Sequence, residues 1–404
     1  MTRARDAARG RMGGTMRAFG YGLAVLLVAG AASTAAAMDD LASILDPVRD
    51  EYQLPAVAAA VVVNGEIVAA GAVGTRVHGM DIPVELDDRF HLGSDTKAMT
   101  ATIAGTMVEE GLIRWDSTVG EVLGGRIEGM SPEFAAVKLS QLLSHSSGIP
   151  TDTEAIVNLY FSPEAFDLPP SQDRLRIIDG WKTNVPQVPE GPPFQYANLG
   201  YITAGAMLET VSGRPWEQLI TERIFDPLEL ESAGLGGTAT DGRYDAPVGH
   251  EVLADGTIVP RPWGVSADAP SSLGPAGTAH MSILDFARWA AWNAGGAKRG
   301  PAIVTPETLA EIQRAHVNTP HRENPPPGTP GDGDYGLGWG VAEFPGADGT
   351  ILLHNGSNGM NIAKILIGRS KDVGIVVATN FPTREADRAA GAILEKLYSV
   401  YGVE

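Results

Sequence analysis

The chain has 404 residues, 44% of them hydrophobic, which is enough for a sizeable core in one or two domains. Its formal net charge of −19 at pH 7 leaves no basic footprint of the kind that nucleic-acid binding requires. Because the sequence contains no cysteine, disulfides, thiolate metal ligands and a cysteine nucleophile are all excluded.

Residues 1–37 have the pattern of an export signal. An arginine-rich stretch precedes an apolar run at 21–30, and three alanines at 35–37 provide the small residues of a cleavage site. We expect cleavage after Ala37, which makes the mature protein periplasmic or secreted, without stable membrane insertion. The alternative is an uncleaved anchor, since residues 18–38 carry no charge and are just long enough to span a bilayer.

From residue 38 onward, the hydrophobic pattern predicts an amphipathic segment followed by a hairpin. Residues 38–52 carry apolar side chains on one face of a helix. Asn64-Gly65, a preferred pair for a type I′ turn, joins apolar runs at 57–63 and 66–73 into two antiparallel strands.

Helical spacing dominates the middle of the chain. It predicts helices over 98–108, 202–211 and 282–292. Residues 151–195 contain many prolines and predict an irregular insertion, either a substrate-facing lid or a surface excursion. Residues 318–334, rich in Pro, Gly and Asp, predict a mobile loop.

The last third predicts a meander of three strands and a closing helix, at 350–354, 361–367, 374–378 and 384–401. Strands at both ends with helices between them indicate an α/β fold, more specifically an α+β sandwich in which an antiparallel sheet is flanked by helices. We expect one domain over residues 38–404. Its α/β part comes from 38–95 and 270–404, and a mostly helical subdomain of about 96–269 is inserted.

Ser94 and Lys97 lie one turn apart at the predicted start of the helix over 98–108. A serine hydroxyl needs a base within hydrogen-bond reach, and a desolvated lysine has a pKa low enough to serve as one. The helix N-terminus adds a backbone donor where an oxyanion would form. The structural alternative is a Ser N-cap followed by a solvated lysine.

Three further polar positions have both a structural and a functional interpretation. Tyr196 and Asn198 lie two residues apart before the helix over 202–211, so they could point into one cleft. A tyrosine held near a lysine in such a cleft could shuttle protons. The structural alternative is an ordinary packed tyrosine and an asparagine that caps the helix. His145, in a polar turn at 144–150, could be a base, but a structural histidine bracing that turn is favoured.

A Gly-containing segment, His354-Asn355-Gly356-Ser357, is expected between two predicted strands. A tight strand end of this kind can bring backbone N–H groups against a substrate carbonyl, because glycine allows close backbone approach.

The three motifs Ser94-x-x-Lys97, Tyr196-x-Asn198 and His354-x-Gly356 occur in one order along the chain. Together they resemble the serine β-lactamase and penicillin-binding-protein family, in its class C-like branch. That branch includes class C β-lactamases, D-alanyl-D-alanine carboxypeptidases, D-aminopeptidases and esterases. The segments 142–150, 275–277 and 335–339 are similar to the same branch, so the resemblance covers roughly the whole mature chain.

The resemblance implies a β-lactamase/transpeptidase-like fold and a role for each matching residue. Ser94 corresponds to the acylated nucleophile, and Lys97 and Tyr196 share the general-base work. Asn198 contacts the lysine and the substrate amide. Backbone N–H groups of Ser94 and Ser357 form the oxyanion hole, and no metal or organic cofactor is needed.

The sequence departs from the family pattern at one strand. His354-Asn355-Gly356 stands where β-lactamases have Lys-Thr-Gly, whose lysine and threonine help hold the substrate carboxylate. With a largely neutral histidine, that anion site is weaker. Lys364 is a candidate replacement. We therefore expect serine hydrolysis, with efficient β-lactam hydrolysis in doubt.

The favoured function is an exported serine hydrolase acting on an ester or amide bond of a small-molecule or peptide substrate. A D-alanyl-D-alanine carboxypeptidase, a β-lactamase and a non-catalytic protein that binds peptidoglycan fragments are the alternatives. An α/β-hydrolase is excluded, because no serine has glycine at both −2 and +2. A calcium loop at 332–343 is rejected because Leu337 stands where the sharp-turn glycine belongs and Gly336 stands at a ligand position. A dinucleotide loop at 336–340 is rejected because it has neither the spacing nor a following helix.

Overall fold

The computed structural model describes residues 38–325 and 328–402. The predicted export signal at 1–37 lies outside the described residues, so export stays a prediction. Within the described part of the chain, no helix combines the length and the apolar character that crossing a bilayer requires.

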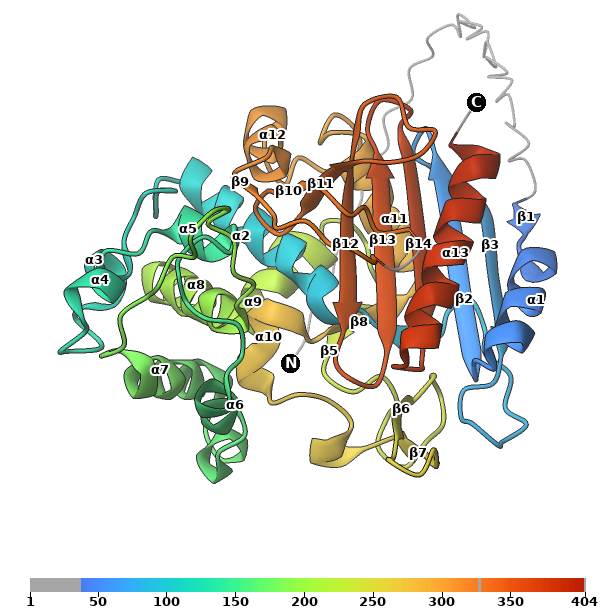
Figure 1. Cartoon of the computed structure of the whole chain (residues 1–404), viewed down its shortest axis with the longest axis horizontal. Helices are drawn as coiled ribbons and strands as arrows, with labels where there is room; N and C mark the ends of the chain where they lie inside the picture. The colour runs from blue at the N-terminus through green and yellow to red at the C-terminus, as the bar shows by residue number, and fades with distance from the viewer. Residues whose placement is uncertain (1–37, 326–327, 403–404) are drawn as a thin grey trace, which may run out of the picture. The chain divides into compact units, whose positions relative to one another are not determined.

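A nine-stranded sheet, counted within the described residues, is built from both ends of the chain (Figure 1). Its strands are β1 (Asp39–Asp40), β2 (Ala56–Val63), β3 (Glu66–Gly74), β9 (Val317–Asn318), β10 (Asp334–Tyr335), β11 (Gly340–Glu343), β12 (Thr350–Ser357), β13 (Ile362–Gly368) and β14 (Val373–Thr379). They lie in the order β1-β3-β2-β14-β13-β12-β11-β10-β9. All neighbours pair antiparallel except β1 with β3. The predicted antiparallel sheet is confirmed.

The hairpin between β2 and β3 has the turn that the sequence predicts. Asn64 and Gly65 both have positive φ, 53° and 88°, as a type I′ turn requires. Two smaller sheets complete the strands: β4 (Arg89–His91) and β5 (Gly234–Leu235) pair with β8 (Ala279–Ser282), and β6 (Gly249–Val252) pairs with β7 (Ile258–Arg261). The β6–β7 hairpin lies in a stretch that the sequence pattern does not reveal as strand.

Helices cover both faces of the large sheet (Figure 1). Helices α1 (Ala42–Tyr52) and α13 (Arg384–Tyr401) pack on one face, and α11 (Ile283–Ala294) packs on the other. Side chains of β2 alternate between them, with Val57 in the core under α13 and Ala58 in the core under α11. Because both faces are buried, β2, β13 and β14 have nearly continuous apolar sequences.

The segment between β4 and β8 is mostly helical. Its helices are α2 (Thr96–Glu109), α3 (Val119–Leu123), α4 (Pro132–Ala135), α5 (Leu139–Leu143), α6 (Glu154–Tyr160), α7 (Pro170–Trp181), α8 (Asn198–Ser212), α9 (Trp216–Ile220) and α10 (Gly274–Gly277), and α12 (Pro306–Gln313) follows β8. Short 3-10 turns η1 (Gly93–Asp95), η2 (Pro163–Phe166) and η5 (Ser271–Leu273) connect some of them. One apolar core continues from the sheet into these helices.

Two local predictions are corrected. The segment 151–195 is irregular only in part, because it contains α6, η2 and α7, whereas residues 182–195 form no helix or strand. Prolines 163 and 170 occupy the first turn of helical segments, where the missing N–H costs nothing. Residues 354–357 do not lie between strands, because β12 continues to Ser357 and pairs in unbroken register with β13.

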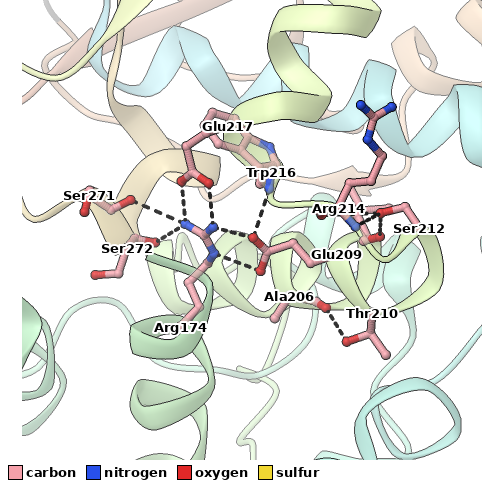
Figure 2. A network of polar contacts seen from close by, with 11 residues as sticks. Arg174, Ala206, Glu209, Thr210, Ser212, Arg214, Trp216, Glu217, Ser271 and Ser272 are labelled. Carbon is pink, nitrogen blue, oxygen red and sulfur yellow. Dashed lines mark hydrogen bonds and ion pairs between the residues drawn. The ribbon is translucent and has the colours of Figure 1, made fainter. Parts of the chain in front are cut away.

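A buried arginine fixes α7 to the helices around it (Figure 2). The guanidinium of Arg174 has no exposed surface and donates to Glu209 of α8 at 3.1 Å and to Glu217 of α9 at 3.0 Å. It also donates to the backbone carbonyls of Ser271 and Ser272 at 3.4 and 3.5 Å. One side chain therefore joins α7, α8, α9 and the turn η5.

We expect Arg174→Met to lower the free energy of unfolding by about 3–5 kcal/mol, because Glu209 and Glu217 would keep their charges without a cation. Urea unfolding followed by circular dichroism measures the loss. Arg214→Met is the matched control, since Arg214 pairs with Glu222 at the surface and such pairs contribute about 1 kcal/mol or less. Equal losses in the two variants would contradict a stabilising role specific to Arg174.

Candidate active site

Ser94 and Lys97 lie where a strand, a tight turn and a helix meet. Strand β4 ends at His91, η1 carries Ser94, and α2 begins at Thr96. Lys97 is in the first turn of α2 and has no exposed surface, whereas Ser94 is half-buried. The sequence spacing of three places the lysine one turn above the serine, and Lys97 Nζ is 3.1 Å from Ser94 Oγ.

Two further acceptors hold the lysine. Lys97 Nζ donates to Asn198 Oδ1 at 2.8 Å and to the backbone oxygen of Ala276 at 2.6 Å. Burial lowers the pKa of Lys97 from 10.5 to about 7, and the carboxylates of Asp152 and Asp95 oppose this shift. A large fraction of Lys97 is therefore neutral near pH 7, the form that accepts a proton.

Tyr196 lies against the same ammonium group. Lys97 Nζ is 4.8 Å from the centre of the Tyr196 ring and 5.3 Å from that of Tyr201. Burial raises the pKa of Tyr196, and a hydrogen bond with Ser94 opposes the rise in part. Tyr196 consequently keeps its proton at neutral pH and is a donor there.

His145 has the structural role that the sequence favours. Its Nδ1 accepts a hydrogen bond from the backbone N–H of Ala197 at 3.1 Å. Its backbone carbonyl accepts one from the backbone N–H of Gln195 at 2.7 Å. The imidazole is buried 4.1 Å, centre to centre, from the Tyr196 ring, and burial lowers its pKa well below the usual range. His145 is thus a neutral brace for the backbone on both sides of Tyr196.

Two glycines bring the serine turn against β12. A Cβ on Gly93, whose φ is +51°, would lie 2.4 Å from the nitrogen of Ser357. A Cβ on Gly356 would lie 1.8 Å from the oxygen of Leu92 and 3.0 Å from the nitrogen of Ser94. The two backbones can approach this closely only without these side chains, and the approach places the nitrogen atoms of Ser94 and Ser357 at the contact between the serine turn and β12.

His354 is turned toward protein groups at both ring nitrogens. Its Nε2 is 2.8 Å from the hydroxyl of Tyr335, and its Nδ1 is 3.3 Å from Oδ1 of Asp95. His354 is 5% exposed and Asp95 is 1% exposed. Burial raises the pKa of Asp95, and the neighbouring imidazole opposes that rise. The His354–Asp95 contact links β12 to the residue that follows the serine.

Lys364 lies outside the site, which corrects the expectation that it could replace the missing strand lysine. Neighbours Ala363 and Ile365 of β13 pack under α11, so Lys364 points to the opposite face of the sheet. There Lys364 Nζ pairs with Asp387 of α13 at 2.7 Å and donates to Asn355 Oδ1 at 3.3 Å.

A pocket of about 120 Å³ opens beside the His354 end of the site. Its lining includes the aromatic residues Phe194, Tyr196 and Tyr335 and two residues that carry charge, Arg322 and Asp332. In the described part of the chain, no three His, Asp or Glu side chains are grouped to hold a metal ion.

The structure brings the predicted residues of all three motifs to one region, but several partners have no signal in the sequence. Ser94, Lys97 and Asn198 are joined by hydrogen bonds, and Gly356 brings β12 against them. Asn198 is the first residue of α8 rather than its cap. The groups that sequence reasoning missed are the carbonyl of Ala276 and the side chains of Asp95, Asp152 and Tyr335.

A model of the Beta-lactamase family matches residues 41–399, nearly the whole described part of the chain. The chain belongs to the Beta-lactamase family. The family predicted from the three motifs is therefore confirmed.

Two curated proteins are similar to this chain over more than half of its length. Penicillin-binding protein 4 of Amycolatopsis lactamdurans is 30% identical over 247 residues, 61% of this chain and 61% of that protein. An unguisins hydrolase of Aspergillus campestris is 25% identical over 366 residues, 88% of this chain and 63% of that protein. The chain thus spans less than two thirds of the length of these curated relatives.

Solved structures confirm the β-lactamase/transpeptidase-like fold. The octameric penicillin-binding protein homologue from Pyrococcus abyssi superposes with a TM-score of 0.70 at 23% identity, covering 89% of this chain and 77% of that chain. A D-stereospecific amidohydrolase from Streptomyces sp. superposes with a TM-score of 0.64 at 22% identity, covering 86% of this chain and 93% of that chain.

Proposed function

We propose that this member of the Beta-lactamase family is a serine hydrolase that cleaves ester or amide bonds through an acyl-enzyme on Ser94. The observation that carries the proposal is the buried Nζ of Lys97, 3.1 Å from Ser94 Oγ. A lysine in that position, with a pKa of about 7, is matched to take the serine proton near neutral pH.

The proposed reaction begins when neutral Lys97 accepts the proton of Ser94 and Oγ bonds to the substrate carbonyl carbon. The carbonyl oxygen becomes an oxyanion, which the N–H groups of Ser94 and Ser357 stabilise. The bond to the leaving group then breaks. The hydroxyl of Tyr196 donates its proton to the leaving group, and protonated Lys97 donates a proton to Tyr196 in turn.

Water completes the cycle in the proposed scheme. It attacks the acyl carbon while neutral Lys97 receives one water proton, directly or by relay through the hydroxyl of Tyr196, the bond to Ser94 Oγ breaks, and Lys97 returns a proton to the serine. The high pKa of Tyr196 supports Lys97 as the proton acceptor and Tyr196 as the relay.

The surroundings of β12 support neutral ester or amide substrates over β-lactams. A β-lactam carboxylate needs a cation at the strand, but His354 has both nitrogens against Tyr335 and Asp95, and Lys364 lies on the other face. Arg322 lines the pocket beside His354 and shares that lining with the carboxylate of Asp332. The shared fold with a D-stereospecific amidohydrolase supports an acyl-transfer reaction on an amide. Amides and esters therefore rank above cephalosporins as substrates.

A rate panel on the purified protein tests this function. It compares a short-chain p-nitrophenyl ester, a D-alanyl-D-alanine peptide and a chromogenic cephalosporin. We expect ester or peptide turnover with little cephalosporin turnover. Ser94→Ala should lower every rate by about 1,000-fold or more, because no other group replaces the nucleophile.

A fluorophosphonate that labels reactive serines provides the second readout. We expect one covalent adduct in the wild-type protein and none in Ser94→Ala with unchanged circular dichroism. Labelling retained by the variant would refute the nucleophile, and no turnover or labelling in the wild type would favour the non-catalytic alternative. Fast cephalosporin turnover would reverse the substrate ranking.

A further inference from the structure

A chain of hydrogen bonds leads from Lys97 into the helical segment. Asn198 Oδ1 accepts from Lys97 Nζ at 2.8 Å, and Asn198 Nδ2 donates to Asp152 Oδ2 at 2.7 Å. Asp152 Oδ1 accepts the hydroxyl of Tyr160 at 3.0 Å. Tyr160 belongs to α6 and is 1% exposed, so packing fixes the far end of this chain.

The chemistry of these groups determines how the amide of Asn198 is oriented. An amide carries an acceptor at one end and a donor at the other. Lys97 offers only donors when it is protonated, and the carboxylate of Asp152 only accepts. The flipped amide would set its NH₂ against Lys97 and its oxygen against the carboxylate, so one orientation is strongly preferred.

We propose that Asp152 is a positioning residue: its carboxylate orients Asn198 so that the amide oxygen holds Lys97 Nζ beside Ser94, and its negative charge favours the protonated lysine. This inference rests on the proposed function, since it gives Asp152 a part in preparing the proton transfer. Asp152 touches neither the serine nor the reacting atoms and acts through Asn198.

Several ionisable groups surround the lysine, so the effect of Asp152 must be separated from theirs. The groups that face Lys97 from the packed elements are Asp95 of η1, Asp152 after α5, His145 in the same connection, Tyr196 before α8 and Tyr201 within it. Burial lowers the pKa of Lys97 most strongly, and Asp152 opposes that shift more than Asp95 does.

Asp152→Asn removes the charge and keeps the shape. Loss of a nearby anion destabilises the protonated lysine, so we expect the pKa of Lys97 to fall by about half a unit to one unit. The acid limb of the labelling rate of Ser94 should move to lower pH by the same amount. The plateau rate should fall roughly ten-fold, because an Asn–Asn pair no longer selects one orientation of the Asn198 amide.

The experiment follows Lys97 directly by side-chain ¹⁵N NMR of ¹⁵N-lysine protein against pH, with the signal assigned by its absence in Lys97→Met. Fluorophosphonate labelling over the same pH range gives the second curve. Glu154→Gln is the matched control, since it removes an exposed carboxylate two residues away. Asp152→Ser repeats the loss of charge with a side chain too short to reach Asn198.

A lowered Lys97 midpoint in both Asp152 variants, with an unchanged midpoint in Glu154→Gln, supports the inference. An unchanged Lys97 midpoint in a folded Asp152 variant overturns the inference. This holds even if the melting temperature falls, because a residue with only a structural role would lower stability without changing the titration of Lys97. The NMR curve needs no turnover. A wild-type protein without labelling would therefore refute the proposed hydrolysis, while a shifted midpoint would still support the link from Asp152 to Lys97.

Discussion

Lys97→Met should lower kcat/KM for ester hydrolysis at neutral pH by about 10²- to 10⁴-fold, the range found for removal of a general base. Methionine fills nearly the same buried volume, so the fold should be retained. The loss would come from the missing acceptor 3.1 Å from Ser94 Oγ. Steady-state kinetics on the p-nitrophenyl ester and circular dichroism measure the two quantities.

The pH profile distinguishes the base from a structural lysine. Protonated Lys97 cannot accept the serine proton, so kcat/KM of the wild type should rise with pH and level off above about 7, the pKa of the lysine. Lys97→Met should lack this limb. Full activity in Lys97→Met would assign the proton transfer to another group. So would a rise of kcat/KM with pH in Lys97→Met that has the same midpoint as in the wild type.

Gly356→Ala is the second change with a large expected effect. The new methyl group would lie 1.8 Å from the backbone oxygen of Leu92, so the serine turn and β12 must separate. We expect kcat to fall about 10²- to 10³-fold, as when an oxyanion donor is lost. Overpacking should also cost about 1–3 kcal/mol of stability. Ester kinetics and urea unfolding measure these losses.

Gly359→Ala provides the comparison for Gly356. Gly359 has φ of +82°, and a methyl group added there would have no atom within 4 Å, so an alanine is strained but meets no neighbour. We expect a loss of stability of about 1 kcal/mol with kcat changed only a few-fold. If both variants lost activity in proportion to stability, the oxyanion hole would not depend on the close approach at Gly356.

The sequence was most informative where a short local pattern determines a single backbone geometry. Ser94 and Lys97 are three apart at a helix start, which forces them onto one face, and Asn64-Gly65 selects one turn. The apolar run over 57–63 was equally reliable as a sign of β2, which is buried on both faces. These features depend on local backbone geometry, so they can be predicted without knowledge of distant contacts.

The sequence was least informative where a contact joins distant segments or uses the backbone. Ala276 supplies a carbonyl to Lys97, and no side-chain pattern marks that role. In the sequence Asp152 is an ordinary polar residue in a proline-rich stretch, and only the fold shows that it contacts Asn198. Prolines at the starts of η2 and α7 suggest breaks in regular structure, although the first turn of a helix tolerates them.

The arginine network of Figure 2 connects α7 to the backbone turn that precedes Ala276. Arg174 holds the carbonyls of Ser271 and Ser272, and Ala276, which accepts from Lys97, follows only four residues after Ser272. A set of variants that replaces Arg174 together with the rest of α7 would therefore remove a support of the turn that precedes the carbonyl partner of Lys97. Variation confined to residues 182–193, between α7 and the Tyr196 segment, leaves that support in place.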